Sequence, residues 1–255
     1  MTMNVTQKDW YHLDNIIAAI YTADAATVLQ QVCKSLKSVI DFDKSFTNLS
    51  SNQNNLNRYF HYESLDIDER TLDSYIQYYV DIDYCAWYTV QPHPSVYRDT
   101  DLINEQKKEQ ATFFKEWMLP MNVYYGCGLS AAANEVSYGE LTLFRSKGKG
   151  DFTDRDLEIL EILNRHLCQF FSGKYPGGIS KSSFDKQMTD FQVKYNLTAK
   201  ENEIIENIKR GVEIKELHKV LFVSENTIKK HLANIYTKLN IKNRSQLIKA
   251  IFHQE

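Results

Sequence analysis

The sequence predicts an α/β domain, built on an antiparallel sheet flanked by helices, followed by a small all-α domain. The chain has 255 residues, and a typical single domain has only roughly 100–200. The segment GKYPGGISKSS at 173–183 combines proline, glycine and serine, which is typical of a linker. Helical and strand patterns alternate before it, whereas only helical patterns follow it. We therefore place a first domain at 1–172, a linker at 173–192 and a second domain at 193–255.

Each element of the first half follows from local periodicity. Apolar residues at helical spacing predict helices at 10–22 (WYHLDNIIAAIYT) and 25–40 (AATVLQQVCKSLKSVI). Strands are expected at 44–50 and 56–62, because the polar run SSNQNN at 50–55 between them is typical of a hairpin loop.

The second half of this domain continues the alternation. Helices are predicted at 68–80 and 102–118, strands at 122–131 and 136–145, and a long amphipathic helix at 151–171 closes the domain. Strand pairs interleaved with helices resemble sensor domains of the GAF and PAS type. A phosphorylated receiver domain would need alternating parallel strands and helices, and the observed order does not fit that arrangement.

Composition and charge exclude several classes of protein. The hydrophobic (43%) and charged (25%) fractions are those of a globular chain, not of a disordered or collagen-like one. The sequence has no long uncharged apolar run and no signal-peptide layout at its start, so we expect a cytoplasmic protein without a membrane partner. The four cysteines form no CxxC pair, so we expect reduced thiols and no metal.

The net charge of −3 conceals two oppositely charged parts. Residues 1–194 carry 19 Lys+Arg against 26 Asp+Glu, a charge of −7, and residues 195–255 carry 11 against 7, a charge of +4. A basic C-terminal domain predicts an anionic partner for that domain.

Capping residues mark the helices of the second domain. Thr198 and Glu201 form the pattern of a capping box, and Gly211 can end the helix that they open. A second, short helix is expected at 213–221, and Ser224 can cap a third helix.

The third helix carries an apolar stripe that must face the first two helices. The stripe consists of Ile228, Leu232, Ile235 and Leu239. Asn240 can take the left-handed conformation that ends this helix, and Asn243 with Gln246 predicts the cap of a last one.

Only Phe222 and Val223 separate the second and third helices, which is the spacing of a helix-turn-helix. With the stripe buried, the opposite face presents ammonium and amide groups that suit a major groove, including Lys229, Lys230 and Asn234. A merely solvated charged face is the alternative. The position beyond the turn, in the basic segment, favours double-stranded DNA as the partner.

The segments LTAKENEII and VSENTIKKHLANIYTKLNIKNRSQ, with Gly211 between them, resemble the signature of the LuxR/FixJ-type DNA-binding domain. The resemblance implies that the third helix enters the major groove, that the fourth contributes to a homodimer, and that the output is transcriptional control. It also implies base contacts by Lys229, Lys230 and Ala233 and phosphate contacts by Thr227 and Lys238. The DNA-binding candidates are Thr227, Lys229, Lys230, Ala233, Asn234 and Lys238.

The connection at 81–102 is dense in aromatic and acidic residues, and long ordered connections are often functional. Its rings and those of neighbouring helices predict a pocket with an aspartate as the orienting polar group; an ordinary aromatic core is the alternative. The candidate ligand-binding residues are Tyr75, Tyr79, Asp83, Trp87, Tyr97, Trp117 and Gly128.

The length and order of the chain are also similar to those of quorum-sensing LuxR proteins, whose first domain binds an acyl-homoserine lactone. Asp83, Tyr97 and Tyr75 resemble pocket residues of that family, and CGLSA at 127–131 resembles its glycine-bearing strand. Thr71 stands where the family has a tryptophan that binds the lactone carbonyl. The resemblance therefore implies a small-molecule ligand but leaves its identity open.

These observations predict a DNA-binding transcriptional regulator that binds inverted-repeat DNA as a homodimer under the control of a small-molecule signal, without a cofactor. The alternative is a ligand-independent LuxR-type regulator whose first domain only dimerises or binds a protein partner. A fused enzyme with Cys127 as nucleophile and His166 as base would need a nucleophile motif and a third orienting group, which we do not find, so we predict no enzyme.

Overall fold

The computed structural model describes residues 4–53, 56–89, 91–181, 194–209, 211–221 and 223–252, which fall into two compact units divided between Ser180 and Lys181. Of the predicted linker at 173–192, residues 173–180 belong to the first unit, and 182–192 lie outside the described residues, as does Phe222. In the part of the chain that is described, no helix is both long and apolar enough to span a membrane.

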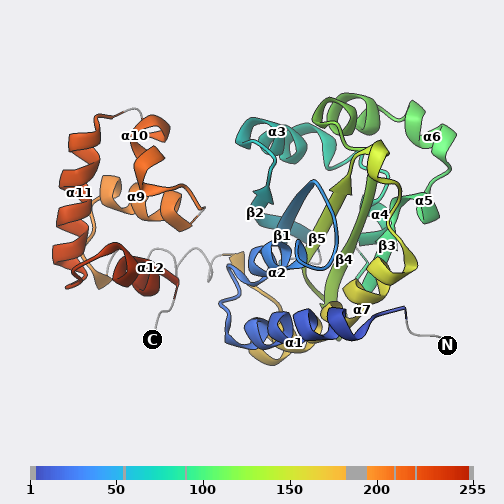
Figure 1. Ribbon diagram of the computed structural model, residues 1–255, viewed down its shortest axis with the longest axis horizontal. Helices are drawn as coiled ribbons and strands as arrows, with labels where there is room; N and C mark the ends of the chain where they lie inside the picture. The colour runs from blue at the N-terminus through green and yellow to red at the C-terminus, as the bar shows by residue number, and fades with distance from the viewer. Residues whose placement is uncertain are drawn as a thin grey trace. The chain divides into compact units, whose positions relative to one another are not determined.

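A five-stranded antiparallel sheet forms the centre of the first unit, with strand order β2-β1-β5-β4-β3 (Figure 1). The strands are β1 (Lys44–Gln53), β2 (Leu56–Leu65), β3 (Ser95–Arg98), β4 (Tyr125–Ala133) and β5 (Val136–Arg145). The predicted antiparallel sheet with flanking helices is confirmed. β3 was not predicted; it pairs with β4 and takes up part of the connection at 81–102.

Helices α2 (Val28–Leu36) and α7 (Asp154–Lys174) pack on one face of the sheet, and α1 (Gln7–Thr22) packs against both of them (Figure 1). Both long helices begin at a capping box, in which a threonine and an aspartate three residues later satisfy each other's backbone N–H groups. The three helices predicted at 10–22, 25–40 and 151–171 are therefore present with small shifts of their ends.

Shorter helical segments accompany the other face of the sheet. They are α3 (Glu69–Ser74), η1 (Tyr75–Tyr79), α4 (Ala86–Thr89), α5 (Asp99–Leu102), α6 (Glu105–Gln110), η2 (Phe114–Met118) and η3 (Leu119–Met121). The prediction of a single helix at 102–118 is wrong. Asn104 caps α6 through the N–H of Gln106, and Ala111 has extended backbone, so the chain stops and restarts twice within that range.

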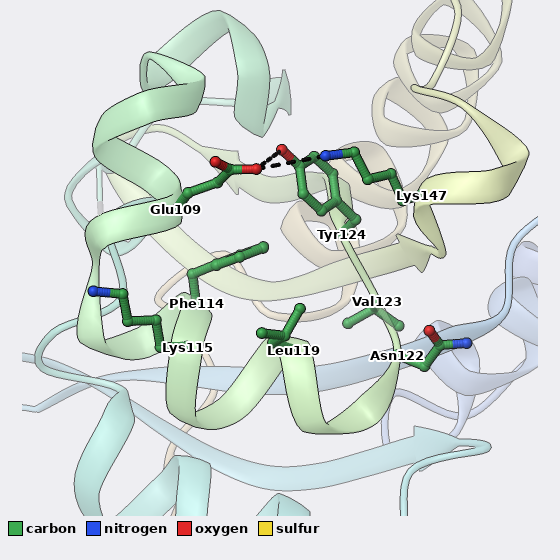
Figure 2. A pocket seen from close by; sticks show the side chains of 8 residues that line it. All are labelled: Glu109, Phe114, Lys115, Leu119, Asn122, Val123, Tyr124 and Lys147. Atoms are coloured by element: carbon green, nitrogen blue, oxygen red, sulfur yellow. Dashed lines mark hydrogen bonds and ion pairs between the residues drawn. The ribbon is translucent and has the colours of Figure 1, made fainter.

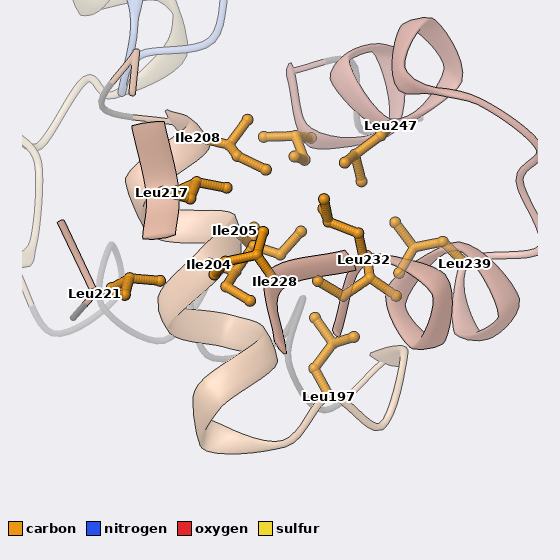
Figure 3. Close-up of a cluster of buried hydrophobic side chains, with 12 residues drawn as sticks. Leu197, Ile204, Ile205, Ile208, Leu217, Leu221, Ile228, Leu232, Leu239 and Leu247 are labelled. Atoms are coloured by element: carbon orange, nitrogen blue, oxygen red, sulfur yellow. The ribbon is translucent and has the colours of Figure 1, made fainter. Parts of the chain in front are cut away.

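The second unit is helical, as predicted. It contains α9 (Ala199–Lys209), η5 (Ile214–Glu216), α10 (Leu217–Val220), α11 (Glu225–Lys238) and α12 (Arg244–Phe252). The predicted stripe on α11 joins a core of buried leucines and isoleucines from α9, α10 and α12 (Figure 3). Burial of this shared core, rather than helix propensity, holds such short helices together.

The predicted caps of the second unit are confirmed. The Thr198 N–H donates to Glu201 and the Glu201 N–H donates to Thr198, at 2.8 and 3.2 Å. Gly211 and Asn240 have left-handed backbone, with φ of 86° and 53°. The Gln246 N–H donates to the side chain of Asn243 at 2.9 Å, which opens α12.

Candidate functional site

Helix α11 presents the candidate DNA-binding surface. Ser224 caps it by accepting the N–H of Thr227 at 3.1 Å, and the hydroxyls of these two residues lie 2.8 Å apart. The buried side of the helix holds Ile228, Leu232 and Ile235, at most 7% exposed. The opposite side leaves four predicted residues exposed: Lys229, Lys230, Ala233 and Asn234. This face has the donors and the small apolar side chain that base edges in a major groove can meet.

Lys238 has a second role within the domain. Its Nζ lies 2.6 Å from Oε2 of Glu201 and 2.8 Å from the carbonyl oxygen of Asn196. Although burial opposes it, hydrogen bonds from Lys238 and Thr198 hold the pKa of Glu201 below its usual value. Lys238 therefore ties the end of α11 to the start of α9, whereas Lys229 and Lys230 are exposed and form no ion pair among the described residues.

A small cavity of about 20 Å³ lies between the helical segments and strands β3, β4 and β5 of the first unit. Two of the predicted ligand residues, Asp83 and Tyr97, line it, together with Tyr84, Asp99 and Thr142. Its volume is close to that needed for one water molecule. Side chains thus nearly fill the interior in this conformation.

Asp83 is held in place by neighbouring donors. The hydroxyl of Tyr75 donates to Oδ2 at 3.0 Å and the N–H of Cys85 donates to Oδ1 at 2.8 Å. Burial raises the pKa of Asp83 to about 6 despite these two bonds. The hydroxyl of Tyr97 lies 3.3 Å from Oγ1 of Thr142 on the same side of the sheet. Asp83 is thereby positioned to orient a polar group that enters the cavity.

The aromatic candidates separate into a buried and an exposed set. Tyr75 and Trp117 are buried with ring centres 5.0 Å apart, and the indole N–H of Trp117 donates to the carbonyl of Thr71 at 2.9 Å. Tyr79 is half-buried, and its hydroxyl reaches Glu116 at 3.4 Å. Trp87 is 57% exposed and does not line the cavity. The structure therefore places Trp87 apart from the other candidates.

Gly128 gives Tyr97 room to pack on the sheet. A Cβ at this position would lie 3.0 Å from the Tyr97 ring and 2.5 Å from the carbonyl oxygen of Leu141. Because the second contact is with backbone of the neighbouring strand, no side-chain movement relieves it. The glycine is thus required chiefly by the close approach of the Leu141 carbonyl on β5, and it also leaves room for the Tyr97 ring.

Sequence reasoning missed a buried ion pair beside the cavity. Nζ of Lys108 lies 2.8 Å from Oδ2 of Asp99, and neither side chain is more than 2% exposed. Burial raises the pKa of Asp99 to about 6, and Lys108 limits that rise. Lys108 belongs to the polar run EQKKEQ, which is typical of a solvated helix, so no local signal could have identified it.

Glu140 on β5 was missed as well. It is 5% exposed and accepts two hydrogen bonds, one from the hydroxyl of Tyr59 and one from Nδ2 of Asn48 at 3.3 Å. Burial raises its pKa to about 7, and the charge of Asp83 contributes in the same direction. The face of the sheet that bears the cavity is therefore acidic as well as aromatic.

The enzyme alternative finds no support in the geometry of its two residues. Cys127 is fully buried on β4, and burial holds the pKa of its thiol well above the usual range, which disfavours a thiolate. His166, the base in that alternative, has its Nδ1 3.0 Å from the hydroxyl of Tyr21 on α1, so this nitrogen already has a hydrogen-bond partner.

Comparison with known proteins identifies the C-terminal unit. The family model GerE, described as bacterial regulatory proteins of the luxR family, matches residues 195–251. The spore germination protein GerE of Bacillus subtilis (strain 168) is 39% identical over 59 residues, which are 23% of this chain and 80% of that protein. The CsgBAC operon transcriptional regulatory protein of Escherichia coli (strain K12) is 42% identical over 52 residues. This match spans 20% of the chain and 24% of the regulator's own length.

Two solved structures have a partly similar chain course. Escherichia coli SdiA has a TM-score of 0.47 at 14% identity, with 95% of each chain covered. The N-acylhomoserine lactone dependent LuxR family factor CepR2 of Burkholderia cenocepacia has a TM-score of 0.45 at 16% identity, covering 65% of this chain and 94% of its own. The match to GerE over most of that protein, in register with the helix-turn-helix described above, establishes that the chain belongs to the luxR family of bacterial regulatory proteins.

Proposed function

We propose that this protein binds inverted-repeat DNA as a homodimer and regulates transcription in response to a small molecule that enters the interior cavity of its first unit. The observation that carries the proposal is the outer face of α11, where Lys229, Lys230, Ala233 and Asn234 are exposed opposite a buried apolar stripe. The basic charge of residues 195–255 supports binding to the phosphate backbone.

In this proposal the exposed face of α11 reads bases. The ammonium groups of Lys229 and Lys230 reach the acceptors of guanine, and the methyl of Ala233 suits contact with a thymine methyl. Thr227 and Asn234 lie near enough to the same face to bond phosphates or base edges. A two-fold dimer would read half-sites whose centres lie about 10 bp apart, one helical turn of DNA.

Asp83 with Tyr75 and Tyr97 supports small-molecule control, because a carboxylate among aromatic rings can orient a ligand with hydrogen-bond donors. Control of DNA binding requires that the ligand favour one arrangement of the dimer over another. The small volume of the cavity favours a second candidate, in which the first unit only dimerises or binds a protein. Native mass spectrometry of the purified chain, with thermal unfolding before and after removal of any bound molecule, separates the two. Ligand loss lowers the stability of a true sensor by RT ln(1+[L]/Kd).

The DNA assignment is tested by Lys230→Ala on a site selected from random duplexes. We expect this variant to lose about 1–3 kcal/mol of discrimination between the selected site and a random duplex, because Lys230 is placed at base edges. Fluorescence anisotropy on both duplexes measures the difference. Equal weakening on the two duplexes would contradict the base-reading role, and unchanged binding to both would contradict the proposed interface. Lys238 is unsuitable for this test because its loss also breaks the ion pair with Glu201.

A further inference from the structure

A second cavity opens on the first unit, in the region of α6, η2, η3 and Lys147 (Figure 2). Its volume of about 420 Å³ falls within the roughly 300–1,000 Å³ of small-molecule sites. None of its lining residues lines the interior cavity. It therefore differs from the proposed signal site both in place and in size.

The wall between the two cavities is the segment that contains η2. Phe113 and Met118 line the interior cavity, whereas Phe114 and Leu119, the next residue in each case, line the surface cavity. Consecutive side chains of one helical segment thus face different cavities. A molecule in the surface cavity has no need to enter the interior one.

The base of the surface cavity is apolar. Figure 2 shows Phe114, Leu119 and Val123 pointing towards its centre. Leu119 is 54% exposed, although Phe114 and Val123 beside it are buried. An apolar ligand would remove the Leu119 side chain from water, which is favourable in proportion to the area covered.

One wall of the cavity is fixed before any ligand arrives. The hydroxyl oxygen of Tyr124 lies 2.6 Å from an oxygen of both Glu105 and Glu109. The ring of Phe114 meets the Tyr124 ring edge-on at 5.3 Å, and buried Lys108 lies 4.6 Å from the centre of the Tyr124 ring. A wall that is already ordered costs little entropy on binding.

The charges at the rim leave a cation available. Nζ of Lys147 lies 3.5 Å from Oε1 of Glu109, and the two side chains are 64% and 47% exposed, so this ion pair is weak. Glu109 is already engaged by the hydroxyl of Tyr124, which lowers its pKa. Lys115 lines the cavity and has no ion pair among the described residues. In Figure 2 the ammonium of Lys115 points away from the other lining side chains, so Lys147 is the lining cation that faces the cavity.

We propose that this surface cavity binds a small apolar carboxylate, whose carboxylate group pairs with Lys147 at the rim and whose apolar part covers Leu119 and Phe114. The site is independent of the proposed signal site and of DNA binding. The positive charge of Lys147 favours an anion over an amine, and the apolar side chains at the bottom of the cavity disfavour small inorganic anions.

The test uses the full chain and three probes of equal length: hexanoate, hexanol and hexylamine. Isothermal titration should show hexanoate binding more tightly than hexanol and hexylamine by at least about fivefold, the effect of one charge-assisted hydrogen bond at a partly exposed site. Lys147→Gln should remove this preference by weakening hexanoate alone. Lys107→Gln, a lysine on the exposed side of α6 away from the cavity, is the matched control and should leave all three affinities unchanged.

Three outcomes would overturn the proposal. Equal binding of hexanoate by the Lys147→Gln and Lys107→Gln variants would place the probe elsewhere, for example in the interior cavity. A preference for hexylamine would assign the rim to cations through Glu109. If none of the three probes bound to the unchanged chain or to Leu119→Asn, the cavity would be only a surface depression.

Discussion

Replacement of Glu140 by glutamine should stabilise the first unit at high pH and leave it nearly unchanged at low pH. Glu140 is buried on β5, and burial raises its pKa from 4.5 to about 7. Above that pH the folded state holds a charged carboxylate in the core, whereas in the unfolded chain water solvates this carboxylate. Protonated Glu140 therefore favours the folded state. This contribution to the free energy of unfolding is complete below the unfolded-state pKa of 4.5 and is lost as the pH rises through about 7.

The size of the effect follows from the shift. A rise from 4.5 to about 7, at ~1.4 kcal/mol per unit, means that ionised Glu140 costs about 3 kcal/mol. Glutamine keeps an oxygen for the hydroxyl of Tyr59 and carries no charge. Its new N–H can donate to Oδ1 of Asn48, which has no hydrogen-bond partner in the described structure, once the Asn48 amide turns over. We therefore expect a gain of up to about 3 kcal/mol at pH 8 and about zero at pH 5.

Urea unfolding of the full chain at the two pH values measures this difference. All three tryptophans, Trp10, Trp87 and Trp117, belong to the first unit, so their fluorescence reports its unfolding. Glu161→Gln, at an exposed position on α7, is the matched control and should change stability little at either pH. A Glu140→Gln effect that is the same at pH 5 and pH 8, or that is destabilising at pH 8, would refute the reasoning.

Three further changes test other parts of the structure. Gly128→Ala should lower the stability of the first unit by about 1–3 kcal/mol through overpacking, because its Cβ would meet the Leu141 carbonyl; urea unfolding followed by tryptophan fluorescence measures it. Lys238→Met should cost the second unit about 1.5–3 kcal/mol at pH 7 by removing a hydrogen bond to a charged group. Since the pKa of Glu201 is lowered, this cost should shrink as the pH falls through its folded value; circular dichroism at two pH values checks both claims. Ser224→Ala should cost about 1 kcal/mol through the lost cap of α11, in the same measurement.

The second unit could be predicted almost completely because its signals are local. A capping box such as that of Thr198 and Glu201 satisfies backbone groups three residues away, and the left-handed Asn240 ends a helix by its own conformation. The stripe on α11 fixes which side is buried and therefore which side is left exposed. Each of these signals can be recognised from residues a few positions apart, although the stripe is buried only by packing against α9, α10 and α12.

The parts that sequence could not supply depend on distant contacts. β3 has four residues, is joined to no hairpin and is defined only by its pairing with β4 about thirty residues later. Burial of Lys108 is decided by Asp99 and by the rings of Tyr124 and Tyr125, which β4 brings next to α6. A lysine in a polar helix gives no sign of such partners beforehand.

The predicted pocket shows that a segment rich in aromatic residues does not reveal which of their side chains point into the interior. Asp83 and Tyr97 come together at the cavity, yet Trp87 between them in sequence points to solvent. The short helix α4 explains this. Cys85, directly before the helix, and Thr89, four residues later at its end, are both buried, which leaves Trp87 on the other side. The side chains that remain around the cavity include buried carboxyls as well as rings. Asp83 already accepts hydrogen bonds from the Tyr75 hydroxyl and the Cys85 N–H, so its carboxylate is satisfied without any bound molecule. A molecule that displaced the Tyr75 hydroxyl would have to supply a donor in its place.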